Sequence, residues 1–404
     1  MWACVRRLIG KKPHDDHVEG ISSESLNNRY CKISTNPKYV APLLKLTVRN
    51  SDEKYIDEYK IFGVLDTLRP TATGVDGLPA WFLRTGAPIF CQPLTHLFNF
   101  SLSTSAVPRQ WKQAWIRSVA KVAVPTQHAD FRPISITPVL TRIIERTVVQ
   151  SYIYPAIQQP PACLTFDDQS AFRPTGSVTA AITTILHKVT HLLVNNPYVI
   201  VIAIDYSKAF DTVRHSTLLA KMAQLDMQDS TYNWLVDFFS GHSHHTKYGE
   251  QTSTLKTISA SIIQGSAIGP ASYVVDASDL QAVTNGNALC KYADDTYLII
   301  PAVNVDSRPA ELHNVNEWAL ANNLKLNLTK SQEIIFTDQR RKTKFSISDE
   351  IPLLQQVQII KILGLTFTSS LSVTLHIQSV IAACAKTLYA LRVLRKHGLC
   401  TTAV

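Results

Sequence analysis

The sequence contains few cysteines, and they lie far apart. The seven cysteines stand at positions 4, 31, 91, 163, 290, 384 and 400, so the closest two are 16 residues apart. This spacing excludes a CxxC zinc pattern and a dense disulfide framework. Most of these cysteines sit in apolar stretches, which favours reduced side chains in a protein core.

Long apolar runs are absent as well. No uninterrupted apolar stretch reaches the roughly 18 residues that a membrane span needs. The first ten residues, MWACVRRLIG, are too short and too charged for a signal peptide. We find no internal repeat and no low-complexity tract. We therefore expect a protein without a transmembrane segment that is not secreted and works in the cytoplasm or nucleus.

The composition is that of an ordinary folded protein with a basic excess. The 404 residues are 45% hydrophobic and 18% charged, and the formal net charge is +9 with a pI of about 9.1. The length allows two or three subdomains around a sizeable core. A basic excess is compatible with a nucleic-acid partner, but a merely basic globular protein would have the same charge.

Three carboxylates follow two stretches that are typical of buried strands. Residues 288–303 read ALCKYADDTYLIIPAV, which predicts a strand, a tight turn with Asp294 and Asp295, and a second strand. The apolar run 199–204 predicts another strand, which ends in Asp205. Adjacent carboxylates repel each other unless a cation lies between them. An isolated DD turn would be a solvated turn, but three such groups suit a pair of Mg²⁺ ions, for which Mn²⁺ could substitute.

The order of motifs resembles a known family. AIDYSKAFDTV, IIQGSAIGP and YADD follow one another as in the palm of a reverse transcriptase, and the flanking motifs resemble the non-LTR (LINE-like) retrotransposon class. The resemblance covers about Phe62 to Arg395. It implies an α+β right-hand polymerase fold with fingers, palm and partial thumb, whose antiparallel palm sheet carries a YADD hairpin.

The resemblance also divides the chain. It implies an N-terminal linker or extension over residues 1–52, mainly fingers with part of the palm over 53–198, and palm over 199–345. The primer-grip hairpin and the start of a truncated thumb follow over 346–404. Within these parts, the residue patterns predict a helix over 222–239, a polar turn over 241–249 and a strand over 255–263.

The function that the resemblance implies is RNA-directed DNA polymerisation by two-metal transfer of dNTPs onto a primer 3′-hydroxyl. The partners would be an RNA template, a DNA or RNA primer and dNTPs; the sequence identifies no protein partner and predicts no membrane partner. Asp205, Asp294 and Asp295 would hold the metals together with the backbone oxygen of Tyr206. Lys330 would act on the pyrophosphate leaving group.

Further residues are assigned by the same resemblance. Nucleotide-binding positions would be Lys121, Arg132, Phe210, Gln264 and Gly265. Template and primer positions would be Arg173, Gly269, Lys361 and Gly364. A triphosphate needs cations, and arginine binds phosphate bidentately, but a lone Lys or Arg is more often a solvated charge. Phe210 would exclude a 2′-hydroxyl or be an ordinary core residue, and Arg173 would contact template or stabilise its own turn.

Some patterns point elsewhere or leave alternatives open. His187 and His191 have a zinc-like spacing, but the HExxH glutamate is missing, which favours surface histidines. The three histidines of residues 241–249 favour a polar hairpin loop over a metal site. An RNA-dependent RNA polymerase shares the two-metal palm, although Phe210 and YADD argue against it. A catalytically inactive retroelement remnant that only binds nucleic acid is the remaining alternative.

Overall fold

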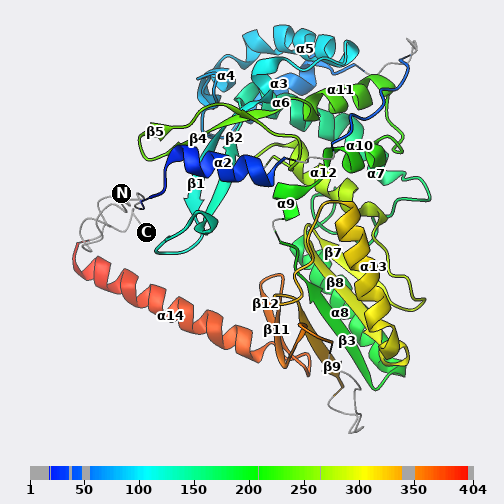
Figure 1. Cartoon of the computed structure of the whole chain (residues 1–404). Helices are drawn as coiled ribbons and strands as arrows, with labels where there is room; N and C mark the ends of the chain where they lie inside the picture. The colour runs from blue at the N-terminus through cyan, green and yellow to red at the C-terminus, as the bar shows by residue number, and fades with distance from the viewer. Residues whose placement is uncertain are drawn as a thin grey trace.

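The chain folds into an upper part, a lower sheet and an extended C-terminal helix (Figure 1). The computed structural model describes residues 18, 20–35, 39–47, 55–207, 209–263, 265–338 and 351–398. Both helices and strands build this part of the chain, which confirms the predicted mixed α+β class.

The lower sheet positions the predicted acidic residues. Its strand order is β10-β9-β3-β8-β7, and all pairs are antiparallel except β9 with β10. The strands are β3 (Tyr198–Ile204), β7 (Ala288–Tyr292), β8 (Asp295–Pro301), β9 (Gln332–Thr337) and β10 (Gln355–Val357). The predicted strand, turn and strand over residues 288–303 is confirmed as β7 and β8, and the run that ends at Asp205 is the central strand.

Strand β3 is apolar on both sides because both faces of the lower sheet are covered. Val199 and Val201 pack with the apolar side of α8 (Val178–Asn195) and with the hairpin of β11 (Ile359–Ile362) and β12 (Leu365–Thr368). Ile200 and Ile202 face the opposite core, which includes α13 (Arg308–Ala321). The side chain of Ser177 accepts a hydrogen bond from the backbone N–H of Ala180 and so caps the first turn of α8.

The upper part contains a second sheet. The turn predicted over residues 241–249 is wrong, because most of these residues form a strand of this sheet. Its strands are β1 (Gln113–Ala120), β2 (Phe131–Ile136), β4 (Ser243–Tyr248), β5 (Gln251–Thr252) and β6 (Lys256–Thr257). Strand β4 lies inside this sheet and pairs in parallel with β1. Its polar residues are buried because neighbouring strands and a helix cover them. Of the strand predicted over 255–263, only Lys256–Thr257 (β6) forms a strand.

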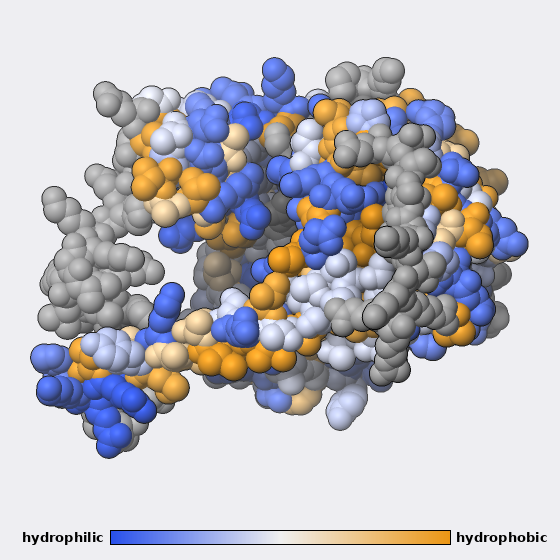
Figure 2. Space-filling model, turned by 90° about the horizontal axis from the view of Figure 1, so that it is seen from below, coloured by the Kyte–Doolittle hydropathy of each residue, from blue (hydrophilic) through white to orange (hydrophobic). Residues whose placement is uncertain are grey.

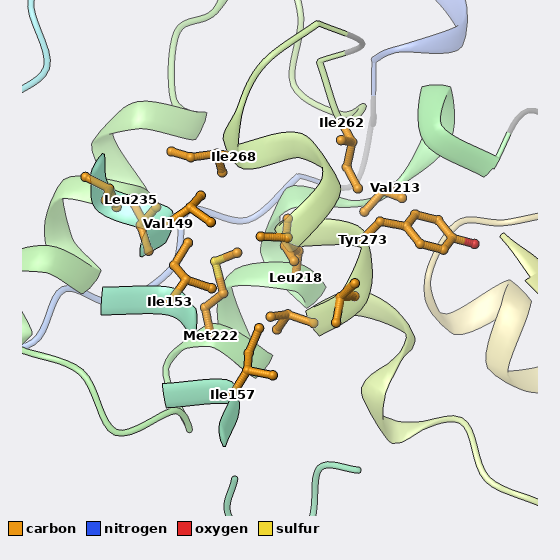
Figure 3. Close-up of a cluster of buried hydrophobic side chains, with 14 of the residues drawn as sticks. Val149, Ile153, Ile157, Val213, Leu218, Met222, Leu235, Ile262, Ile268 and Tyr273 are labelled. Atoms are coloured by element: carbon orange, nitrogen blue, oxygen red, sulfur yellow. The ribbon is translucent and has the colours of Figure 1, made fainter. Parts of the chain in front are cut away.

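The helices of the upper part share one apolar core. Figure 3 shows Val149 and Ile153 pointing toward Leu218, Met222 and residues of two further helices. A π-helical segment, Val149–Ile153, joins two of these helices. The helices are α3 (Glu58–Asp66), α4 (Ala80–Thr85), α5 (Ala87–Ser103), α6 (Val139–Val148), α7 (Tyr154–Gln158), α9 (Ala209–Thr212), α10 (His215–Met222), α11 (Asp229–Phe239) and α12 (Ile268–Asp276). Short 3₁₀ turns are Arg109–Lys112, His128–Asp130, Ala277–Asp279 and Ala302–Ser307.

Two further expectations need correction. The helix predicted over 222–239 is interrupted, because α10 ends at Met222 and α11 begins only at Asp229, with that carboxylate in its favourable first turn. The extension over residues 1–52 is not all linker. Helix α2 (Ser23–Ile33) begins with a capping box and packs Leu26 and Tyr30 against the upper sheet.

The C-terminal helix α14 (Thr374–Lys396) extends away from the rest of the molecule (Figure 1). Apolar residues lie along it and hydrophilic residues gather at its far end (Figure 2). None of its residues is buried, because no other described segment covers its apolar residues. By length and composition alone, α14 is long and apolar enough to cross a membrane. A single helix of this kind is weak evidence for a membrane span.

Buried histidines in and beside β4 predict an acid-sensitive fold. Burial lowers the pKa of His242 to about 3 and the pKa of His215 and His244 to about 4. An unfolded histidine titrates near pH 6.5. The unfolded chain therefore binds more protons between about pH 6.5 and 4, and stability is lost as the pH falls through this window.

We expect His242→Asn to weaken this pH dependence. Each buried histidine contributes a slope of about 1.4 kcal/mol per pH unit below pH 6.5. Urea unfolding of the parent and the variant at several pH values measures the difference in slope. Buried acids such as Glu145, whose pKa is raised to about 7 by burial, act in the opposite direction but are common to both proteins. Identical slopes would contradict the prediction.

Candidate active site

The three predicted acidic residues meet at one end of the lower sheet. In the pairing of β3 with β8, Ile204 lies opposite Thr296. Carried one residue further, this register sets Asp205 beside Asp295. In the pairing of β7 with β8, Tyr292 lies opposite Asp295, so Ala293 and Asp294 form the turn. Residues 89 positions apart in the sequence thus converge, as the sequence analysis required.

The electrostatics of the carboxylates confirm their proximity. Partial burial, and then the charge of Asp205, raise the pKa of Asp294. Burial and the charges of Asp294 and Asp205 raise the pKa of Asp295 to about 6. Burial, and then the charge of neighbouring carboxylates, thus disfavour the charged forms of Asp294 and Asp295. The donors are all oxygens, the ligand type that Mg²⁺ prefers, but within the described residues no group of three His, Cys, Asp or Glu side chains is arranged as a metal site.

A buried glutamine from outside the sheet holds the acidic turn. The Oε1 atom of Gln169 accepts hydrogen bonds from the backbone N–H of Ala293 at 3.0 Å and of Ala171 at 2.9 Å. Its Nε2 atom donates to the carbonyl oxygen of Ala293 at 3.5 Å. Ala293 has a φ of +54°, a strained conformation for a residue with a side chain. Gln169 therefore fixes the residue that immediately precedes Asp294.

The same outer segment is tied to β7 by an ion pair. The Nζ atom of Lys291 lies 3.0 Å from Oδ2 of Asp168, and it also donates to the carbonyl oxygens of Ala277 and Leu280 at 2.7 and 2.8 Å. The lysine is buried, so these partners compensate for the loss of water around its charge. Residues 168–170 are thereby held against the edge of the lower sheet.

A second segment holds the end of β3. The hydroxyl of Ser331 donates to the carbonyl oxygen of Asn327 at 2.9 Å, and the backbone N–H of Asp205 donates to that hydroxyl at 3.1 Å. The carbonyl oxygen of Asp205 accepts from the backbone N–H of Asn327 at 2.9 Å. Since Lys330 lies on this segment, the contacts fix the lysine relative to Asp205.

Nine of the fourteen predicted site residues line one open cavity of about 690 Å³. They come from the upper sheet, the end of β3, the loop before α12, the acidic turn and the segment after α13. These residues are Lys121, Arg132, Asp205, Tyr206, Phe210, Gly265, Gly269, Asp294 and Lys330. The cavity therefore brings cations from one part of the fold to carboxylates from another.

The cations lie on the side of the cavity formed by the upper sheet. Lys121 follows β1 and donates to the carbonyl oxygen of Ala129 at 3.1 Å, and Arg132 lies on β2. Desolvation, and then the positive charge of Arg132, lower the pKa of Lys121, and the charge of Lys330 has the same effect. The positive charges of Arg132 and Lys330 thus act on Lys121 at the cavity wall, and positive charge gathered in this way attracts anions.

Phe210 both lines the cavity and packs against the apolar core. Its ring stacks on Tyr273, with the centroids 4.6 Å apart and the planes 24° apart. Its carbonyl oxygen accepts a hydrogen bond from the backbone N–H of Ile262 at 2.7 Å. The ring is thus fixed from below by the apolar core that Figure 3 shows around Tyr273.

The glycine loop before α12 is held by a buried acid that the sequence analysis did not identify. Glu145 accepts hydrogen bonds through Oε2 from the hydroxyl of Ser266 and from the backbone N–H groups of Ala267 and Ile268. Gly265 has a φ of +114°, and a Cβ atom there would lie 2.2 Å from the carbonyl oxygen of Ser135. A side chain at this position would therefore separate the loop from β2.

Four other predicted residues, Asp295, Arg173, Lys361 and Gly364, do not line the cavity. Gln264 is outside the described residues. Arg173 donates from Nη1 to the carbonyl oxygens of Phe166 and Gln169, so these contacts support its structural alternative. Lys361 and Gly364 belong to the predicted hairpin of β11 and β12, which is connected to the acidic strand where the backbone N–H of Leu363 donates to the hydroxyl of Tyr297 at 3.3 Å.

The residues that sequence reasoning missed share one property. Gln169, Ser331 and Glu145 are buried polar residues that bond backbone groups far away in the sequence. Nothing in their local patterns distinguishes them from surface residues.

Comparison with known proteins places this geometry in a family. Over residues 121–367 the chain matches the family described as reverse transcriptase (RNA-dependent DNA polymerase). It is 26% identical over 301 residues to the RNA-directed DNA polymerase from mobile element jockey of Drosophila melanogaster, with 72% of this chain and 32% of that protein aligned. It is 23% identical to the probable RNA-directed DNA polymerase from transposon X-element of the same organism, with 71% and 32% aligned.

A more distant relative is a retrovirus-related Pol polyprotein from the type-1 retrotransposable element R2 of Bradysia coprophila, 21% identical with 68% of this chain and 33% of that protein aligned. The chain spans about a third of the length of these relatives. A solved telomerase of Candida tropicalis aligns with 71% of this chain and 48% of its own at 13% identity and a TM-score of 0.46. The family match covers more than half of the chain, which belongs to the reverse transcriptase (RNA-dependent DNA polymerase) family, with non-LTR retrotransposon polymerases as homologues.

Proposed function

We propose that this chain is the polymerase domain of a non-LTR retrotransposon protein and transfers dNTPs onto a primer 3′-hydroxyl under the direction of an RNA template. The convergence of Asp205 with Asp294 and Asp295 opposite Lys121 and Arg132 carries this proposal, because carboxylates and cations line one cavity. In this assignment the lower sheet is the palm, the upper part is the fingers, and α14 begins the thumb.

The chemistry of the donors suits a pair of Mg²⁺ ions, although the described side chains do not stand in a ready coordination arrangement. Asp205, Asp294, Asp295 and the backbone oxygen of Tyr206 would hold them, and the repulsion among the carboxylates is what bound cations would relieve. When bound, such ions acidify an attacking hydroxyl and stabilise a departing pyrophosphate; Mn²⁺ could replace them.

The chain's own groups then orient the substrate. Lys121 and Arg132 bind the triphosphate, and Lys330 lies where it can neutralise charge on the leaving group. Phe210 lies against the sugar edge, where its ring leaves room for hydrogen but not for a 2′-hydroxyl. Gly265 lets backbone approach the nucleotide, and Gly269 lets it approach the template. Gln264 is proposed as a further nucleotide-binding residue. Lys361 and Gly364 seat the primer end, and Arg173 supports the segment facing the template.

We expect Asp294→Asn to abolish primer extension while leaving the fold intact. The loss should exceed the roughly 10–100-fold typical of removing a residue that only supports a metal ligand. The pKa of Asp294 is raised, so removing its charge should leave thermal stability at pH 7 equal or higher. Extension assays and thermal unfolding measure the two effects. Asp226→Asn, an exposed site with the same charge change, serves as control; parent-like extension by Asp294→Asn would refute the assignment.

Gln169→Met should affect catalysis through the acidic turn. The apolar side chain has a similar length but cannot bond Ala293, so the turn loses its support. We expect extension to fall roughly 10–100-fold and the Mg²⁺ concentration for half-maximal rate to rise. Gln158→Met, the same change on the surface, is the matched control. A purely structural role would lower the amount of folded protein without moving the Mg²⁺ dependence.

Phe210→Ala should relax the choice of sugar. Without the ring, the ratio of dNTP to NTP incorporation should fall by roughly tenfold or more, because the shape that rejects a 2′-hydroxyl is lost. Phe210→Tyr keeps the ring and should keep the ratio. If the parent protein itself incorporates NTPs as readily as dNTPs, the RNA polymerase alternative is favoured. If it binds template and primer but extends with neither, the inactive remnant is favoured.

A further inference from the structure

A second cavity, of about 470 Å³, lies on the upper part of the fold and does not share residues with the catalytic cavity. Arg142 and Arg146 enter it from consecutive turns of α6, and Arg69 enters it from the segment that follows α3. Thr67 and Thr71 add hydroxyl groups to its rim. Three guanidinium groups from two segments thus line one hollow.

Among the described residues the arginines have no direct ion-pair partner, and Glu145 and Asp76 act on Arg142 only from beyond contact distance. Arg142 donates from Nη2 to the carbonyl oxygen of Ala72 at 2.7 Å, while its buried Nε has no hydrogen-bond partner. Arg142 and Arg146 lie four residues apart on α6, and like charges at this spacing destabilise a helix. A bound anion would reduce the repulsion between them.

The cavity is rigidly connected to the catalytic cavity. The segment with Arg69 and Thr71 continues to Gly74, where a Cβ atom would lie 2.4 Å from Cα of Pro138. Pro138 joins β2 to α6, and the other end of β2 carries Arg132 into the catalytic cavity. Six residues lie between Arg132 and Val139, so at most roughly 20 Å of extended chain connects the two cavities.

Basic residues line two cavities that are joined by one continuous segment, β2 and α6. A ligand that reaches both cavities must be long, which favours a polynucleotide over a small anion. A stacked nucleic-acid strand rises about 3.4 Å per nucleotide, so roughly six nucleotides span 20 Å. Arginine binds phosphate through a planar pair of donors. We infer that Arg69, Arg142 and Arg146 bind backbone phosphates of the single-stranded template about six nucleotides away from the catalytic cavity. This inference rests on the proposed function, which supplies the template.

The test compares template–primer duplexes with single-stranded template overhangs of 2 and 10 nucleotides. Both Arg69 and Arg146 are exposed, so the double variant Arg69→Gln/Arg146→Gln should fold normally. Its affinity for the 10-nucleotide overhang should fall, and the slope of log affinity against log salt should decrease by about 0.7 for each lost contact. Affinity for the 2-nucleotide overhang should equal that of the parent.

The matched control is Arg84→Gln/Arg109→Gln, which removes the same charge at exposed positions that do not line the cavity. Equal losses for both overhangs, equal losses in the control, or no loss at all would overturn the inference. Fluorescence anisotropy measures binding without catalysis. Failure of the polymerase assignment would appear separately, as a parent protein that binds both duplexes but extends neither.

Discussion

The antiparallel pairing of β3 with β8 is the interaction on which the candidate site depends. It sets Ile204 opposite Thr296 and thereby brings Asp205 to the acidic turn. A shift of the register by one residue would turn every side chain of β3 to the other face of the sheet. The site would lose its geometry and both apolar cores would lose their contacts. Catalytic alignment and hydrophobic packing therefore specify the same register.

Around this pairing, the protein holds its functional backbone with buried side chains from other segments. Gln169 fixes the acidic turn, Ser331 fixes the end of β3, and Glu145 fixes the glycine loop. Each satisfies backbone groups that a turn or helix end would otherwise leave unpaired. Residues that contact substrate in our proposal are few, and the residues that position them come from three separate segments of the described chain.

The parts of the fold that the sequence predicted are those with a strong local pattern. Strand β3 is an unbroken β-branched run, and the hairpin of β7 and β8 combines apolar strands with an acidic turn. Strand β4 was missed because its residues, SHHTKY, are polar, and only the neighbours in the sheet make them buried. Helix α2 was missed for the same reason, since its apolar residues are recognisable as core only beside that sheet.

The central place of β3 has a consequence for synthesis of the protein. Its partner β9 ends at Thr337, 133 residues after Ile204, so ribosomes making roughly 5–20 residues per second need about 7–27 seconds to supply it. During that interval an apolar strand has an unpaired edge, the feature that promotes association between nascent chains. Chaperones that shield emerging strands should therefore strongly influence the yield of this protein, and a product that stops before Thr337 would stay aggregation-prone.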